Sequence, residues 1–310
     1  MNKFDRRDFL KASFSTAAAI TAGLNLPSVA KADQNTISCK NFRTNISHNA
    51  KPWTHLDFYN DAKNFTFAIV SDRTGYYRPG VFNTAVNKLN LMLPEFVMSV
   101  GDLIDGNNGV KSVDVAQEKW DEFNYMVNRL KMPFFYVPGN HDHGYNDFLR
   151  QAWENNHGPN HYYFIYKGVL MLCINTDEDN VNSITDEQVA YIENVIKTHT
   201  DVRWTCVFFH NPMWRHNPPK PYWVKIEAML ADRNYTVFGG HIHHYTKAVK
   251  NGKKYYTLAT TGGCASGEGG NPAGPAKGEF DHFAWVTMTD EGPVMANIVL
   301  DGVLNDEGKV

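Results

Sequence analysis

Short apolar segments that run directly into polar side chains are the feature that most constrains this sequence. Segments 65–71, 96–101, 133–139, 204–209 and 235–239 have the length and the aromatic and β-branched content of buried strands. The side chains that follow them can all bind a metal ion: Asp72, Asp102, Asn140 with His141 and Asp142, His210, and His241 with His243. In an α/β sheet, sites are built at the carboxyl ends of the strands. One such residue is commonly a turn or a cap, but a purely structural role does not explain the whole set.

Helical segments separate most of these strands and indicate the α/β class. Apolar spacing predicts helices over 81–93, 113–130, 185–199 and 222–233, strands over 161–166 and 169–175, and hairpins at 251–252 and 290–293. Glycine and proline predict a long loop over 262–278. No repeat or linker divides residues 63–302, which predicts one domain with a mixed sheet arrangement, preceded by a polar N-terminal surface segment over 33–62.

Residues 1–32 have the features of a targeting signal rather than of a folded element. The run Arg6-Arg7-Asp8-Phe9-Leu10-Lys11 resembles the twin-arginine export signal, and Ala30-Lys31-Ala32 is a cleavage sequence. A basic N-terminal anchor helix is the alternative, but Ser, Thr, Gly and Asn interrupt the short apolar stretch. We therefore expect a periplasmic or secreted protein, without a stable membrane anchor after processing. The twin-arginine machinery carries folded proteins, so a metal can be loaded before export.

Charge and cysteine content exclude two other classes of function. Removal of residues 1–32 takes away five of 30 basic and two of 33 acidic residues, which leaves a formal charge of −6. No basic run stands out, so binding to nucleic acid is not expected. The four cysteines, Cys39, Cys173, Cys206 and Cys264, form no C-x-x-C pair, so a thiolate zinc site is not supported.

The residue types after the strands favour a transition-metal centre. Carboxylate and amide oxygens combined with three imidazoles suit Mn, Fe or Zn. His241 and His243 are two residues apart, so on an extended segment both side chains point to one face, roughly 6.6 Å apart. Two metal ions about 3.5–4 Å apart could be straddled by that pair. Six ligands exceed the needs of one tetrahedral ion, and the two oxygens of Asp102 can bridge, so the residues favour a dinuclear site.

The order of these motifs resembles the calcineurin-like metallophosphoesterase family over about residues 65–245. The resemblance rests on Asp72, Gly101-Asp102-x-x-Asp105, Gly139-Asn140-His141-Asp142, His210 and Gly240-His241-x-His243. It implies two packed mixed β-sheets flanked by helices, a four-layer sandwich. It also implies that Asp72, Asp102 and His243 bind one ion, and that Asp102, Asn140, His210 and His241 bind the second.

The resemblance further implies the reaction. Two ions would generate a hydroxide that attacks a phosphomonoester or phosphodiester in line. His141 would stabilise the phosphoryl oxygens or protonate the leaving group, and Asp142 would orient it; the alternative for His141 is a supporting hydrogen bond. The rival function is a metal- or phosphate-binding protein of the same fold that lacks turnover.

The first motif departs from the family pattern. The family usually has Asp-x-His, whereas this chain has Asp72-Arg73-Thr74, so the first ion lacks an imidazole. Purple acid phosphatases of the same superfamily also lack it and use a tyrosine at the position of Asp105. Asp105 is therefore a candidate substitute ligand, with a loop-stabilising role or a water ligand as the alternatives. Arg73 is a candidate phosphate clamp, or else part of a structural ion pair.

Overall fold

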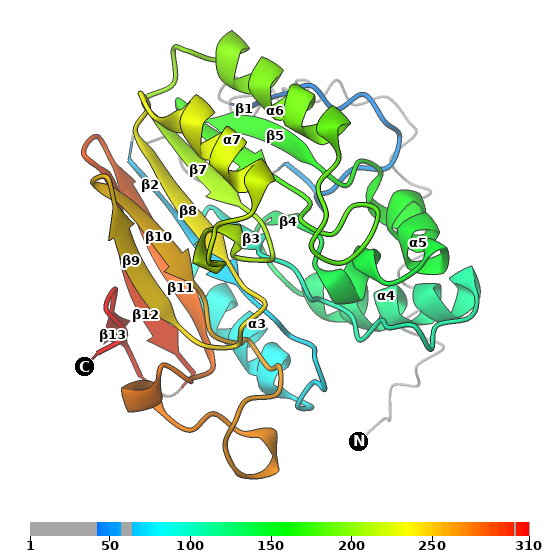
Figure 1. Cartoon of the computed structure of the whole chain (residues 1–310). Coiled ribbons are helices and arrows are strands. Elements are labelled where there is room, and N and C mark those ends of the chain that lie inside the picture. The colour runs from blue at the N-terminus through cyan, green and yellow to red at the C-terminus, as the bar shows by residue number, and fades with distance from the viewer. Residues whose placement is uncertain (1–41, 57–63, 301, 310) are drawn as a thin grey trace, which may run out of the picture. The chain divides into compact units, whose positions relative to one another are not determined.

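Two β-sheets make up the centre of the fold. The computed structural model describes residues 42–56, 64–300 and 302–309 (Figure 1). The seven-stranded sheet has the order β1 (Phe42–Thr44), β5 (Tyr162–Tyr166), β6 (Val169–Cys173), β7 (Trp204–Phe208), β8 (Tyr235–Gly239), β10 (Lys253–Thr257), β9 (Thr246–Lys250). The six-stranded sheet has the order β13 (Leu304–Asn305), β12 (Gly292–Val299), β11 (His282–Thr289), β2 (Phe65–Val70), β3 (Phe96–Ser99), β4 (Phe134–Phe135).

Both sheets are mixed. Strands β2, β3 and β4 run parallel, as do β6, β7, β8 and β10, while β1, β5, β9, β11, β12 and β13 pair antiparallel with their neighbours. Five of the parallel strands therefore end at polar loops: β2, β3 and β4 from one sheet, β7 and β8 from the other. This arrangement lets two sheets contribute side chains to one site.

The two sheets pack face to face through aromatic side chains. Along β2, Phe65, Phe67 and Ile69 face the other sheet, whereas Ala68 and Val70 face the helices, as the two-residue period of a strand requires. Contacts across the interface include Phe135 of β4 stacked on Phe164 of β5, with ring centroids 4.2 Å apart. Such rings bury a large apolar area each, which holds the sheets in register.

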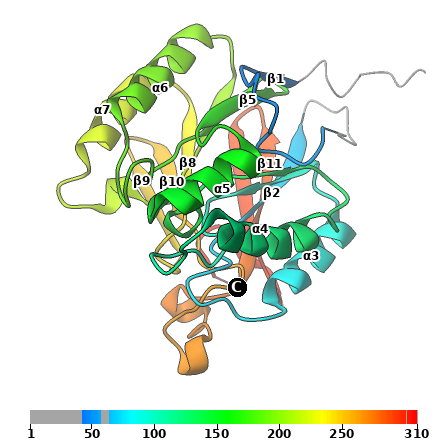
Figure 2. The ribbon, with the colours of Figure 1, turned by 90° about the vertical axis from the view of Figure 1, so that its right-hand side faces the viewer.

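Helices cover the outer faces of both sheets. The six-stranded sheet is covered by α3 (Val81–Met92), α4 (Val113–Val127) and α5 (Asp147–His157), and the seven-stranded sheet by α6 (Asp186–Thr198) and α7 (Pro221–Leu230). Figure 2 shows α6 and α7 on one side of the strands and α3 and α4 on the other. The predicted four-layer sandwich is confirmed. None of the helices in the described ranges could span a lipid bilayer.

Most predicted elements are present, and the differences are short or polar segments. The four predicted helices lie within three residues of the observed ends, and the Thr185 hydroxyl caps α6 by accepting from the Gln188 N–H at 3.1 Å. The helix α5 was not predicted, nor were β1 and β13. The described part of segment 33–62 contributes β1 to the sheet edge, and the proposed signal over 1–32 lies outside the described residues.

Candidate metal centre

The loops after five parallel strands carry the predicted ligands. Asp72 lies two residues after β2, Asp102 three after β3, His210 two after β7 and His241 two after β8. Asn140 begins a short π-helical turn, Asn140–Gly144, that follows β4. Because these strands come from both packed sheets, ligands that are up to 171 residues apart in sequence reach a common place.

The structure brings the predicted ligands into two adjoining groups. Donor atoms of Asp72, Asp102 and His243 lie within 4.8 Å of one another, and so do those of Asp102, His210 and His241. We call these the first and the second group; Asp102 belongs to both. Asn140 joins the second group, because its Oδ1 lies 2.9 Å from His210 Nε2 and 2.9 Å from His241 Nδ1.

Backbone carbonyls orient two of the imidazoles. His210 Nδ1 donates to the Val100 carbonyl at 2.9 Å, which leaves Nε2 to face Asp102 Oδ2 at 3.2 Å. His243 Nδ1 donates to the Cys264 carbonyl at 2.5 Å, and its Nε2 lies 3.3 Å from an oxygen of Asp72. A metal-binding histidine is usually held through its second ring nitrogen in this way.

Carboxylates and imidazoles shift one another's pKa. Burial lowers the pKa of His210, but the charge of Asp102 outweighs it and raises that pKa to about 10. Burial also lowers the pKa of His243, but the hydrogen bond and the charge of Asp72 outweigh it and raise that pKa to about 9. Burial and the nearby charge of His210 lower the pKa of His241 to about 4. The buried carboxylates therefore favour positive charge beside them, whether carried by protons or by metal ions.

The donor set fits two transition-metal ions. Oxygen donors and three imidazoles match the preferences of Mn, Fe and Zn. Two ligand atoms that bind one ion lie roughly 3–4 Å apart, and the donors of each group lie within 4.8 Å of one another. Asp102, which both groups contain, is 2 % exposed, so its charge is poorly screened by water. The residues thus suit the metal centre that their sequence pattern indicates.

The ligands occupy an unusual backbone conformation. The φ angles of Asp102, His241 and His243 are 57°, 71° and 56°, and that of Asp72 is 21°. Side chains other than glycine rarely adopt these values, and such strain gathers at functional sites. The prediction that residues 241–243 are extended was wrong, because β8 ends at Gly239 and the backbones of His241 and His243 adopt the left-handed conformation. The two still divide between the groups, as predicted.

Glycine is required at two motif positions because a ligand carboxylate lies close to the backbone there. A Cβ on Gly139 would overlap the Asp102 carboxylate, and a Cβ on Gly240 would overlap the Asp72 carboxylate. Each glycine directly precedes a predicted ligand, Asn140 or His241. The motif glycines therefore allow the backbone at the end of one strand to lie against a ligand that follows another strand.

His141 lies at the edge of the cluster, with its side chain one-fifth exposed. Its backbone N–H donates to Asp102 Oδ1 at 2.9 Å, its Nδ1 to the Gly106 carbonyl at 2.5 Å, and its Nε2 lies 4.0 Å from Asp102 Oδ2. The structure places the Gly106 carbonyl, rather than the expected Asp142 carboxylate, against Nδ1 of the His141 ring.

Asp142 instead holds the loop that carries Asp102. Its carboxylate accepts hydrogen bonds from the N–H groups of Leu103, Ile104 and Gly139 at 2.8–2.9 Å. Burial and the charge of Asp102 raise the pKa of Asp142 to about 7, against these three bonds. Its contribution to the site is therefore the position of Asp102.

Arg73, Thr74 and Asp105 form contacts beside the cluster. The Arg73 guanidinium is ion-paired with Glu122 and donates to the Leu103 carbonyl at 3.1 Å. This is the structural ion pair that was the alternative to a phosphate clamp. The Thr74 hydroxyl donates to Asp105 Oδ1 at 2.7 Å. Asp105 belongs to neither donor group among the described residues, so the structure places it next to the substituted position without including it in a ligand set.

One residue that the motifs did not indicate touches the cluster. The Tyr145 hydroxyl accepts a hydrogen bond from Asn140 Nδ2 at 3.1 Å, and its ring lies edge-on to the ring of His141, with centroids 5.2 Å apart. A tyrosine five residues after the asparagine is indistinguishable in sequence from an ordinary packing residue. Only its three-dimensional contacts identify it.

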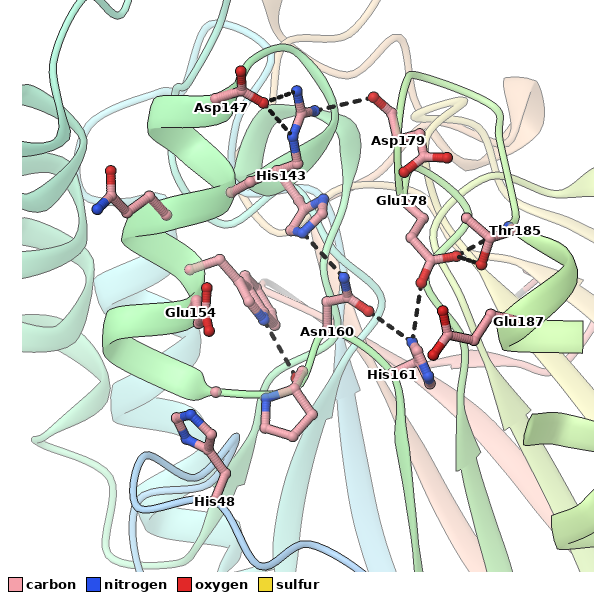
Figure 3. Close-up of a pocket in the computed structure, with 15 residues that line it drawn as sticks. His48, His143, Asp147, Glu154, Asn160, His161, Glu178, Asp179, Thr185 and Glu187 are labelled. Atoms are coloured by element: carbon pink, nitrogen blue, oxygen red, sulfur yellow. Dashed lines mark hydrogen bonds and ion pairs between the residues drawn. The ribbon is translucent and has the colours of Figure 1, made fainter. Parts of the chain in front are cut away.

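A separate pocket of about 760 Å³ lies beside α5 (Figure 3). Its lining includes His143, Asn160, His161 and Glu178 but none of the predicted ligands. His143 Nε2 lies 3.2 Å from Asn160 Nδ2, Asn160 Oδ1 lies 2.7 Å from His161 Nδ1, and that nitrogen lies 3.3 Å from Glu178. These contacts connect the 140–144 turn with the pocket wall.

Comparison with known proteins identifies the family. The model of the calcineurin-like phosphoesterase family matches residues 39–245, a range that contains all the predicted ligands. The chain belongs to the calcineurin-like phosphoesterase family. The uncharacterized protein YvnB of Bacillus subtilis is 27 % identical over 205 residues, which are 58 % of this chain. The chain spans 15 % of the length of that relative.

Solved structures of the superfamily share the fold. A purple acid phosphatase from yellow lupin has a TM-score of 0.60 at 15 % identity, covering 78 % of this chain and 53 % of its own. GAP50 of Plasmodium, described as an anchor in the inner membrane complex, has a TM-score of 0.57 at 16 % identity, covering 78 % and 89 %. PhoD has a TM-score of 0.55 at 11 % identity, covering 79 % and 72 %.

The left-handed ligand conformation generates a stability prediction. In buffer with a chelator, His241→Gly and His241→Ala both remove the imidazole, but only glycine accepts a φ of 71° without strain. We expect the glycine variant to be more stable by about 1 kcal/mol, or roughly 2–4 °C in Tm, measured by scanning calorimetry.

The same pair of substitutions at His216 is the matched control. His216 is exposed and has a φ of −65°, so glycine should give no advantage over alanine there. Equal stability of the two His241 variants would show that the backbone at this ligand is not strained.

Proposed function

We propose that this member of the calcineurin-like phosphoesterase family is a dinuclear metal-dependent hydrolase of phosphomonoesters or phosphodiesters. The observation that carries the proposal is the pair of donor groups that share the buried carboxylate of Asp102. A single structural ion would not require a second group of carboxylate and imidazole donors directly beside the first. The family membership supports phosphoester chemistry at this centre.

The protein's own groups have distinct tasks in this proposal. Asp72, Asp102 and His243 would hold the first ion, and Asp102, Asn140, His210 and His241 the second. When bound, the two ions supply a nucleophile at neutral pH and neutralise the charge of the phosphoryl group. The chain itself holds their ligands in place through the carbonyls behind His210 and His243.

His141 is the proposed proton donor to the leaving group. Its Nδ1 donates to the Gly106 carbonyl, so Nε2 is the ring atom that remains to face a substrate. The partly exposed side chain lies at the edge of the ligand cluster, where a substrate can reach it. A positioned acid of this kind typically contributes 10²–10⁴-fold to a rate.

A binding protein of the same fold is the second candidate. Two observations favour it: Thr74 stands where the family usually has a metal-binding histidine, and GAP50, which shares the fold, is described as an anchor. Such a protein would bind metal or phosphate without turnover. Metal content and hydrolysis, measured on the same preparation, separate the two functions.

We also propose export through the twin-arginine pathway, on the basis of the Arg6-Arg7 motif and the Ala30-Lys31-Ala32 sequence. Cell fractionation of the full chain should find a shortened, folded protein outside the cytoplasm. The variant with both Arg6→Lys and Arg7→Lys should remain unprocessed inside the cell, because the twin-arginine machinery reads the arginine pair. Unchanged processing of that variant would exclude this route.

The metal content should be close to two ions per chain. After expression in metal-replete medium, elemental analysis of the wild type should give about two transition-metal ions. His241→Ala should lower that number, since it removes a donor of the second group. His216→Ala is the matched control and should retain both ions, because His216 is exposed and belongs to neither donor group. A wild-type content near zero contradicts the dinuclear centre.

Hydrolysis of a panel of phosphomonoesters and phosphodiesters by the metal-loaded protein tests the activity. We expect turnover of at least one class, and a loss of roughly 10²–10⁴ in kcat for His141→Ala with the metal content unchanged. His161→Ala provides a control, since His161 lines the separate pocket. Two bound ions without turnover of any phosphoester would favour the binding protein, and an unchanged kcat would remove His141 from the mechanism.

A further inference from the structure

The orientation of the Asn140 side-chain amide decides whether Asn140 can bind a metal ion. An amide presents an oxygen that binds a metal ion and a nitrogen that does not, and the two ends have nearly the same shape. Oδ1 lies 2.9 Å from the ring nitrogens of both His210 and His241, while Nδ2 points to the Tyr145 hydroxyl at 3.1 Å. The oxygen therefore faces the second donor group.

Burial makes the partner of the amide nitrogen important. Asn140 is 2 % exposed, so an N–H of its amide cannot rely on water for a hydrogen bond. Leaving a buried donor unpaired is unfavourable, which penalises any orientation that lacks an acceptor. Tyr145 is the acceptor that this N–H has when Oδ1 is turned toward the histidines.

Tyr145 is itself held firmly. It directly precedes Asn146, whose side-chain oxygen caps α5 by accepting from the Leu149 N–H at 3.1 Å. Its ring packs against the core between the six-stranded sheet and the helices. The hydroxyl therefore occupies a defined position, as a supporting group must in order to fix a ligand.

We propose that Tyr145 is a positioning residue of the second metal site. Its hydroxyl supplies the acceptor that the Asn140 amide needs when the amide oxygen binds an ion. Its ring, edge-on to His141 at 5.2 Å, also limits the movement of the proposed proton donor. The inference rests on the proposed dinuclear centre, and Tyr145 acts through Asn140 and His141 rather than on the reacting atoms.

Calorimetric titration of the metal-free protein with Mn²⁺ tests this role. Tyr145→Phe keeps the ring and removes only the hydroxyl, so it should weaken one of the two Mn²⁺ binding steps, the one at the second donor group, by about 10–100-fold, as the loss of such supporting groups typically does. The other binding step should be unchanged. Tyr125→Phe is the matched control, because Tyr125 is 75 % exposed on α4, and should titrate like the wild type.

Two further results distinguish a failure of the positioning role from a failure of the proposed metal centre. If the wild type binds two Mn²⁺ ions and Tyr145→Phe binds both with unchanged affinity, the positioning role is wrong while the dinuclear centre stands. If the wild type binds none, the proposed centre itself fails. A melting temperature of metal-free Tyr145→Phe close to that of the wild type, together with weaker second-site binding, separates a positioning role from a general loss of stability.

Discussion

The negative charge of Asp102 lies where the two sheets meet and where water hardly reaches, and the surrounding elements are arranged to compensate it. The seven-stranded sheet supplies His210, 3.2 Å away, and the turn after β4 supplies the His141 N–H at 2.9 Å. An isolated carboxylate in such surroundings is strongly destabilising. The sheets must therefore pack in the register that brings these partners to Asp102, and that register also assembles the remaining ligands.

The left-handed backbone at the ligands depends on this packing. Each such residue is unfavourable in isolation by about 1–2 kcal/mol, so the conformation persists because the surrounding contacts determine it. Asp142 provides one set, through three backbone N–H groups that hold the Asp102 loop. The aromatic interface between the sheets provides another. Stability of the core and geometry of the site are thus two aspects of one arrangement.

Sequence was informative where a local pattern had one structural solution. Apolar strands followed by Asp, Asn or His predicted the residues that meet at the strand ends, and the family resemblance that these motifs carry implied the four layers. The hydrogen-bond partners of individual side chains were harder to predict from the sequence. Arg73 and Asp142 each had several polar groups within reach, and side-chain rotamers and loop conformations determined which group was bound. The strands β1 and β13 are too short for a period to be visible. The buried residues of α5, Leu149, Ala152, Trp153 and His157, do follow a helical period, so that helix was predictable.

The glycines at 139 and 240 have a consequence for how such a centre can vary. At both positions the backbone of one strand end lies against a carboxylate of another, and even a methyl group does not fit. The position of each carboxylate is therefore limited by how closely a peptide backbone can approach it, a length that substitutions cannot adjust in small steps. What remains adjustable is the chemical identity of a donor at fixed spacing. The threonine at position 74 is such a change of donor, a hydroxyl where the family usually has an imidazole.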